Sequence, residues 1–434
     1  MNPITVGLIG MALLVFTLFL GIPIAFALAL VGVLGIGWLT GPSVGLTMLS
    51  RDMFEAFSSY PLTVITMFVL MGSYAFAAGI GSRSYQTSHK FFGGLPGGLA
   101  IAGLAAATAF GAVCGSAAAT AATIGKVTLP EMKKYGYADS LATGMVASSG
   151  GLGILIPPSS AFIVYGVLTE QSIGKLFISG VIPGLILAAL FILCLVLMCW
   201  YNPALAPRGM RTTLKEKFLS LAGILDALVL FGVTMGGLFG GWFSPTQAGA
   251  IGAGGALAIG VATRQLTWQG FIGATKEGLV IACMVLCLIA GATVFGHFLA
   301  LCTLTTALAH WMTELPLPPI GILAIICLIF FVLGCFVDTM PLIVILVPLF
   351  YPVVTALGYD PIWFGVVIIL LAAVGLVTPP VGVNAFVVKG IAADVPLETI
   401  FKGALPFIAA YVLALAIVIL FPQTATYLPS IVSY

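Results

Sequence analysis

Long apolar segments without a polar face constrain the fold of this chain more than any other feature. Residues 179–200 and 404–422 are apolar around the whole helix circumference, for about the 20 residues that a bilayer core demands. Over the whole chain 61% of residues are hydrophobic and 6% are charged, whereas soluble domains carry roughly a quarter charged residues. The alternation expected for barrel strands is absent. The sequence therefore predicts an all-α polytopic membrane protein that lies in a lipid bilayer.

Basic residues indicate which connections face the cytoplasm, because Lys and Arg are enriched there. The expected cytoplasmic linker is 201–220, which holds Arg208, Arg211, Lys215 and Lys217. No Lys or Arg occurs from residue 277 to residue 388, so connections in that interval are expected on the opposite side.

In each of two apolar segments, both ends are expected on the same side of the membrane. Residues 95–130 lie between basic connections, and residues 316–357 lie between connections without positive charge. We therefore expect two re-entrant helical hairpins, one entering from each side of the membrane. Non-helical backbone at a hairpin tip is tolerated at membrane depth only where protein or a water-filled cavity satisfies it, so both tips are candidate functional positions.

An internal repeat relates the two hairpin regions. An offset of 222 residues superposes Pro130 on Pro352, Gly136-Tyr137 on Gly358-Tyr359, Gly153 on Gly375, and Pro157-Pro158 on Pro379-Pro380. The first copy is followed by the basic pair Lys133 and Lys134 and the second is not, so we expect inverted topologies. Inverted repeats are typical of alternating-access transporters.

The repeat divides the chain into five expected parts. They are an N-terminal span and interfacial arm of a scaffold (1–60), a first repeat (61–200) with hairpin 95–130 and broken helix 139–165, the linker 201–220, scaffold helices (221–278), and a second repeat (279–434) with hairpin 316–357 and broken helix 361–388.

Each copy contains a span that proline and glycine should interrupt near the membrane midplane. These segments are SSGGLGILIPPSS from Ser148 and VGLVTPPVGVNAF from Val374. Proline removes a backbone donor, and interrupted helices present carbonyl oxygens to cations and helix N-termini to anions. A packing kink is the alternative interpretation.

The hairpins carry the polar candidates. Ser116 and Thr120 supply hydroxyls among small residues, although these small residues could instead form a helix-packing face. Asp338 lies in an otherwise uncharged apolar run, where a carboxylate costs about 2.5–3.5 kcal/mol on insertion scales. Its charge therefore needs a bound cation, a set of hydrogen-bond donors or a proton. The alternative interpretation is that Asp338 caps a helix. Asn384 could be a ligand or a cap, and Lys126 is expected to snorkel toward the cytoplasmic interface.

The composition also bears on the coupling ion and on cofactors. Few ionisable groups are available for a proton relay, whereas carbonyls, hydroxyls and one acid suit sodium. The eight cysteines show no CxxC pattern and no histidine cluster, so we expect no transition metal and no other cofactor. A net charge of +2 gives no indication of nucleic-acid binding.

Five motifs together resemble the large membrane subunit of tripartite ATP-independent periplasmic (TRAP) transporters, of the DctM and SiaM type, over essentially the whole chain. The motifs are GSAAATAATIG, PEMKKYGY, SSGGLGILIPPSSAFIVYG, GCFVDTMPLIVILVPLFYPV and VGLVTPPVGVNAFVVKG. The resemblance implies a sodium-coupled importer in the bacterial inner membrane that works by an elevator movement on a small organic acid, such as a C4-dicarboxylate or sialic acid. It also implies two partners, a periplasmic binding protein and a small four-helix membrane subunit, which we expect to be a separate chain.

The resemblance further implies sodium sites where each hairpin meets its broken helix. The first neighbourhood is Ser116, Ser148, Ser149, Gly151 and Pro157, and the second is Asp338, Thr339, Gly375, Thr378 and Val381. Adjoining candidates for ion or substrate binding are Gly115, Thr120, Gly150, Ser159, Pro379 and Asn384.

Other functions stay open at this point. A stand-alone sodium- or proton-coupled carboxylate carrier would need no binding protein. An intramembrane serine protease would use Ser116 as nucleophile and His297 as base, but it leaves the duplication unexplained. A purely structural scaffold leaves Asp338 unexplained.

Overall fold

The computed structural model describes residues 2–207 and 213–432, and within these ranges the regular structure is entirely helical. Helices satisfy their own backbone hydrogen bonds, as apolar segments in a membrane must. The all-α prediction is confirmed. Arg208 and Arg211 of the expected linker lie outside the described residues.

The first half of the chain forms eleven α-helices and one short 3₁₀ helix. They are α1 (Pro3–Phe19), α2 (Ile24–Thr40), α3 (Pro42–Ser58), α4 (Thr63–Ala77), α5 (Ile80–Phe92), α6 (Gly98–Cys114), α7 (Ala117–Lys134), α8 (Asp139–Ser149), α9 (Leu152–Leu155), α10 (Ser160–Thr169), α11 (Ile173–Tyr201) and η1 (Pro203–Leu205).

The second half of the described chain is also helical. It comprises α12 (Leu214–Ser220), α13 (Ala222–Phe239), α14 (Pro245–Ala262), α15 (Trp268–Leu301), α16 (Leu304–Thr313), α17 (Pro319–Gly334), α18 (Thr339–Ala356), α19 (Pro361–Gly375), α20 (Val383–Ile391), α21 (Leu397–Leu420) and α22 (Gln423–Ile431).

Five of the described helices are long and apolar enough to cross a membrane, namely α11, α13, α15, α18 and α21. The apolar segment 179–200 lies within α11, and the segment 404–422 overlaps α21 as far as its end at Leu420. Two helix pairs are apolar and long enough to cross if each counts as one bent span, with an angle of 52° between α3 and α4 and of 43° where α8 and α9 meet α10. Because α18 is itself long enough to cross, its length does not separate a hairpin arm from a full span.

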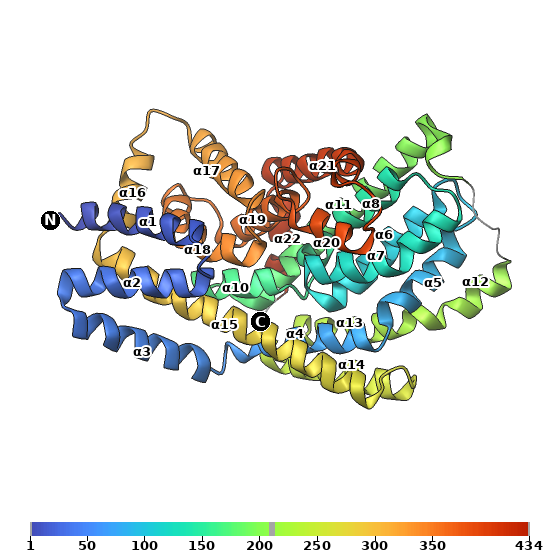
Figure 1. Cartoon of the computed structure of the whole chain (residues 1–434), viewed down its shortest axis with the longest axis horizontal. Helices are drawn as coiled ribbons and strands as arrows, with labels where there is room; N and C mark the ends of the chain where they lie inside the picture. The colour runs from blue at the N-terminus through green and yellow to red at the C-terminus, as the bar shows by residue number, and fades with distance from the viewer. Residues whose placement is uncertain (1, 208–212, 433–434) are drawn as a thin grey trace.

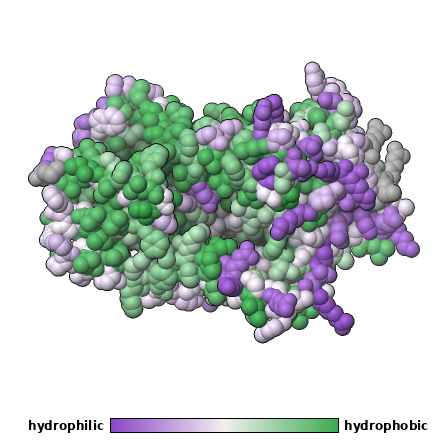
Figure 2. All heavy atoms as spheres, in the orientation of Figure 1, coloured by the Kyte–Doolittle hydropathy of each residue, from purple (hydrophilic) through white to green (hydrophobic). Residues whose placement is uncertain are grey.

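Side chains of low hydropathy gather toward one end of the molecule. Figure 2 shows them on the side where α5, α7 and α12 lie, and Figure 1 places the N-terminus and α16 at the other end. The distribution is typical of a membrane protein with one strongly charged face.

The sequence repeat is also a repeat of local structure. α7 covers residues 117–134 and α18 covers 339–356, so both their first and their last residues differ by 222. Each helix is followed by a glycine with positive φ, Gly136 at 71° and Gly358 at 80°. Ser116 and Asp338 occupy the two equivalent N-cap positions. α7 continues past residue 130, the expected end of the first hairpin, with Pro130 inside the helix.

Two groups of helices pack around the hairpins. In the first group, α4 packs against α15 and α14, and α15 also packs against α2. In the second group, α7 packs against α6, α8 and α20, and α8 also packs against α21. α4 belongs to the sequence range of the first repeat, yet its neighbours include α14 and α15 of the later chain. The hairpin helices therefore face a wall that combines distant parts of the sequence.

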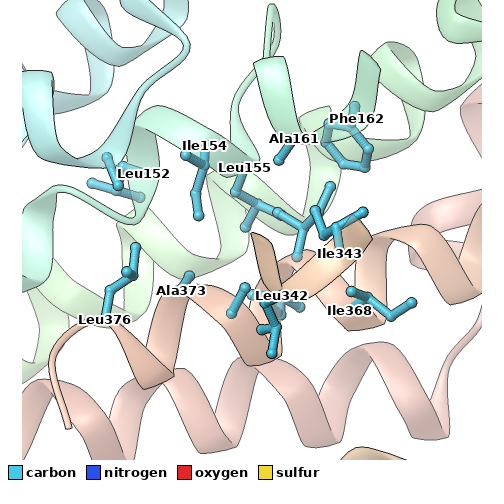
Figure 3. Close-up of a cluster of buried hydrophobic side chains, with 14 of the residues drawn as sticks. Leu152, Ile154, Leu155, Ala161, Phe162, Leu342, Ile343, Ile368, Ala373 and Leu376 are labelled. Carbon is cyan, nitrogen blue, oxygen red and sulfur yellow. The ribbon is translucent and has the colours of Figure 1, made fainter. Parts of the chain in front are cut away.

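An apolar core joins the two repeats beside the interrupted helices. Figure 3 shows Leu155 of α9 and Phe162 of α10 near Ile343 of α18, whereas Leu152 of α9 lies on the side of Leu376. All five side chains are at most 2% exposed. Close packing of this kind resists displacement of one element past another, so the core holds both interruptions in a fixed relation.

Candidate functional site

The first interrupted helix ends against α21. α8 stops at Ser149, the single turn of α9 follows, and α10 starts only at Ser160. Tyr411 Oη donates a hydrogen bond of 2.8 Å to the Ser148 carbonyl. A Cβ at Gly151 would overlap Tyr411 Oη, so glycine permits this approach.

The tip of the first hairpin is bound to the chain that follows the first Pro–Pro pair. The Gly115 carbonyl accepts hydrogen bonds from Ser160 N at 3.3 Å and from Ser160 Oγ at 2.9 Å. Gly115 has φ of 69°, and a Cβ there would lie 2.6 Å from the Pro158 carbonyl oxygen. Ser116 Oγ accepts from Ala119 N at 3.4 Å and caps α7.

The tip of the second hairpin makes the corresponding contact. The Cys335 carbonyl accepts hydrogen bonds from Val381 N and Gly382 N, both at 3.3 Å. A Cβ at Gly375 would lie 2.5 Å from the Gly334 carbonyl carbon, so the hairpin and α19 approach backbone to backbone. The Pro157–Pro158 and Pro379–Pro380 peptide bonds are both cis. Each hairpin tip therefore accepts hydrogen bonds from the residues that follow a Pro–Pro pair.

Both tips open onto one cavity of about 440 Å³. Its lining includes residues at the N-termini of α7, α10 and α18, represented by Ser116, Ser160 and Thr339. The opposite wall consists of α4 and α15, which contribute Phe76 and Glu277 among others. Helix N-termini carry partial positive charge and free N–H groups, so three of them at one cavity favour a ligand with anionic or acceptor groups.

Three charged side chains line the cavity among the described residues: Lys126, Glu277 and Asp338. Asp338 is exposed, makes no N-capping hydrogen bond, and has no ion-pair partner within the described chain. The geometry therefore does not favour the capping interpretation of Asp338. Its carboxylate lies in the cavity lining and is accessible to a ligand.

Buried oxygen atoms without a hydrogen-bond partner gather behind the first hairpin tip. They include Thr120 Oγ1, Ser148 Oγ and Asn384 Oδ1, all on residues that are 0% exposed. A Cβ at Gly153 would overlap Thr120 Oγ1, and one at Gly150 would lie 2.5 Å from Asn384 Nδ2. Buried oxygens without a partner are costly, and oxygen donors of this kind are those that hard cations prefer.

Asn384 connects the two repeats. It belongs to α20 of the second repeat, and its Nδ2 donates a hydrogen bond of 3.1 Å to the Ala147 carbonyl of α8. Its Oδ1 has no partner. The first candidate neighbourhood therefore includes an atom from the second repeat.

The structure distributes the predicted site residues over three places. Those that line the cavity are Gly115, Ser116, Asp338 and Thr339. Those buried behind it or between helices are Thr120, Ser148, Ser149, Gly150, Gly151, Pro157, Ser159, Gly375 and Asn384. Those at the more accessible second interruption are Thr378, Pro379 and Val381.

Sequence reasoning missed the roles of Ser160, Glu277 and Tyr411 in this site. Ser160 follows the first Pro–Pro pair almost directly, and Glu277 is an acid within a long apolar segment; both signals can be read from the sequence. Tyr411 lies among apolar residues with no pattern that distinguishes it, and only the fold brings it to Ser148.

Ser116 and His297 do not form a nucleophile and base pair in this structure. Ser116 caps α7, whereas His297 Nδ1 lies 2.9 Å from Asp52 Oδ2. Each side chain thus has another partner, and the arrangement expected of a serine protease is not present in these described residues.

Comparisons with known proteins agree with the transporter interpretation. Residues 11–424 match the family described as "Tripartite ATP-independent periplasmic transporter, DctM component". The chain is 34% identical over 419 residues to the sialic acid TRAP transporter large permease protein SiaM of Vibrio cholerae, covering 95% of this chain and 96% of that one. It is 34% identical over 383 residues to the C4-dicarboxylate TRAP transporter large permease protein DctM of Pseudomonas aeruginosa, covering 88% and 89%.

Two further similarities concern length and fold. The chain is 34% identical over 427 residues to the isethionate TRAP transporter permease protein DctMQ of Oleidesulfovibrio alaskensis; the match covers 96% of this chain but 64% of that longer protein. The crystal structure of the YdaH transporter of Alcanivorax borkumensis has a similar fold, with a TM-score of 0.65 at 16% identity, over 88% of this chain and 90% of that one.

Proposed function

Because this chain belongs to the DctM family of tripartite ATP-independent periplasmic transporters, we propose that it is the large membrane subunit of a sodium-coupled importer of a small organic acid. The observation that carries the proposal is the cavity on which both hairpin tips and three helix N-termini open. Relatives are named for sialic acid and C4-dicarboxylates, which are acids small enough for such a site.

The charges of the cavity support coupling to a cation. The lining holds one ammonium, Lys126, and two carboxylates, Glu277 and Asp338, so the net charge of its side chains favours a cation over a lone anion. Charges are expensive to bury without partners. An organic acid that enters together with sodium avoids this cost, because the ions neutralise both the substrate and the lining acids.

Two neighbourhoods are proposed to bind sodium. Thr120, Ser148 and Asn384 bring unpartnered oxygens to the first interruption, and Asp338 and Thr339 bring a carboxylate and an unpartnered hydroxyl to the second hairpin tip. Interrupted helices that offer oxygen ligands are a common arrangement in secondary transporters.

The proposed transport movement is a displacement of the hairpins and interrupted helices relative to α4 and α15. One face of α7 and the facing surfaces of α4 and α15 form the two walls of the cavity. Gly72 of α4 lies close to the Cys114 carbonyl at the first hairpin, where a Cβ would come within 2.8 Å. Small residues at such a contact permit the close helix approach that sliding requires.

The proposed partners are a small four-helix membrane subunit and a periplasmic binding protein that delivers the acid. The match to DctMQ, which covers 64% of that longer protein, supports a further membrane component. The proposed location is the bacterial inner membrane, with the charged end of the molecule (Figure 2) in the cytoplasm.

Uptake by proteoliposomes tests the function. We expect accumulation of radiolabelled succinate or N-acetylneuraminate only with an inward sodium gradient, the small membrane subunit and a matching binding protein. Accumulation by this chain alone would instead favour the stand-alone carrier. Uptake driven by a proton gradient without sodium would contradict the coupling ion.

A further inference from the structure

Lys126 lies in the cavity far from the first hairpin tip. It is ten residues beyond Ser116 on α7, about 15 Å along the helix axis at 1.5 Å per residue, and both residues belong to the cavity lining. Lys126 is the only basic side chain among the described residues of that lining. The structure thus places a positively charged side chain at a distance from the proposed sodium ligands of this hairpin.

The Lys126 ammonium contacts an aromatic ring of the opposite wall. Its Nζ lies 5.5 Å from the centroid of the Phe76 ring of α4. The Lys126 side chain is exposed at the cavity, so its snorkelling toward the cytoplasmic interface stays a prediction beside this contact. A cation–π contact is worth about 0.5–2 kcal/mol, enough to favour this orientation.

The contact with Phe76 leaves the hydrogen-bond donors of Lys126 available. An ammonium has three N–H donors, and a ring face satisfies them weakly. Lys126 forms no ion pair within residues 2–207 and 213–432. An oxyanion that enters the cavity therefore meets one attractive side-chain charge, Lys126, and is repelled by Glu277 and Asp338.

We propose that Lys126 binds the carboxylate or sulfonate group of the substrate and so selects for anionic substrates. The inference rests on the proposed transport function and adds to it a specificity-determining residue outside the hairpin tips. The remainder of the substrate then extends toward the N-termini of α7, α10 and α18, whose N–H groups suit hydroxyl, carbonyl or further acidic oxygens.

Lys134 provides a matched control. It lies on the same helix, its Nζ is 5.8 Å from the centroid of the Tyr135 ring, and it does not belong to the cavity lining. Lys126→Met and Lys134→Met therefore remove the same charge and the same kind of aromatic contact at two places on α7. Lys126→Arg keeps the charge.

The experiment measures binding to the purified chain with its small membrane subunit in detergent, by thermal stabilisation in sodium chloride. The probes are succinate, N-acetylneuraminate and isethionate. For the probe that stabilises the wild type, we expect the dissociation constant to rise at least about tenfold in Lys126→Met, as loss of a charge-assisted hydrogen bond implies. It should stay within about threefold in Lys126→Arg and Lys134→Met, and stabilisation by sodium alone should be unchanged in every variant.

Four results would overturn the proposal. The first two are wild-type affinity in Lys126→Met and an equal loss in Lys134→Met. The third is loss of the stabilisation by sodium alone in Lys126→Met, which would indicate a structural role. The fourth is that no probe stabilises the wild-type complex in sodium, which would refute the proposed function itself and the role of Lys126 with it.

Discussion

Replacing Thr120 by valine separates ion binding from folding. Thr120 is fully buried and its Oγ1 has no hydrogen-bond partner, so Thr120→Val removes a hydroxyl while keeping the β-branched shape. A buried polar group without a partner costs about 1–3 kcal/mol. Without sodium, the variant should therefore be as stable as the wild type or more stable.

In sodium, Thr120→Val should instead be less stable than the wild type. If the Thr120 hydroxyl is a sodium ligand, its loss should raise the half-saturating sodium concentration about tenfold, which corresponds to about 1.4 kcal/mol. The measurement is the melting temperature of the purified protein in sodium chloride and in choline chloride. The gain in melting temperature from sodium should shrink in Thr120→Val.

Thr128→Val is the matched control for this prediction. Thr128 is also fully buried on α7, but its Oγ1 donates a hydrogen bond of 2.8 Å to the Ile124 carbonyl. Its loss should lower stability by about 0.5–1.5 kcal/mol, equally in both salts. If Thr120→Val behaved like this control, with an unchanged sodium half-saturation, the assignment of Thr120 as a ligand would be wrong.

Three other perturbations test the site and the topology. Asp338→Asn should abolish sodium-dependent uptake while the protein still inserts, and wild-type sodium dependence in proteoliposomes would refute its role. Gly151→Ala should lower the melting temperature, because the added Cβ overlaps Tyr411 Oη, at a cost of about 1–3 kcal/mol. The double variant Gly151→Ala with Tyr411→Phe should recover part of this loss. If the single and the double variant were equally unstable, the overlap would not be the cause. Single cysteines at Lys133 and Gly358 should react with a membrane-impermeant thiol reagent from opposite sides, and labelling from one side only would contradict the inverted repeat.

The helices and their interruptions could be predicted from local signals. Proline and glycine decide the backbone within a few residues, so the interruptions at Pro157 and Pro379 follow from the amino-acid sequence alone. The offset of 222 residues likewise relates the segments that form α7 and α18. Re-entrance of the hairpins and inversion of the repeats stay predictions, because they depend on a membrane.

Contacts between distant segments could not be predicted in this way. Asn384 reaches the Ala147 carbonyl across 237 residues, and no periodicity encodes that pairing. The opposite wall of the cavity combines α4 with α15, so only the packing of those helices shows that Glu277 lines the cavity. The sequence position of Lys126 indicates which helix carries it but not which ring lies across from it.

The positions of the cavity charges bear on how membrane voltage acts on transport. Lys126 belongs to the first hairpin and Asp338 to the second, whereas Glu277 lies on α15 of the other wall. Under the proposed movement, the hairpins carry one positive and one negative lining side chain, which cancel. Each net charge that crosses is worth about 2.3 kcal/mol per 100 mV. The empty return step would then be nearly insensitive to voltage, and the membrane potential would act through the sodium ions and the acid that the hairpins carry.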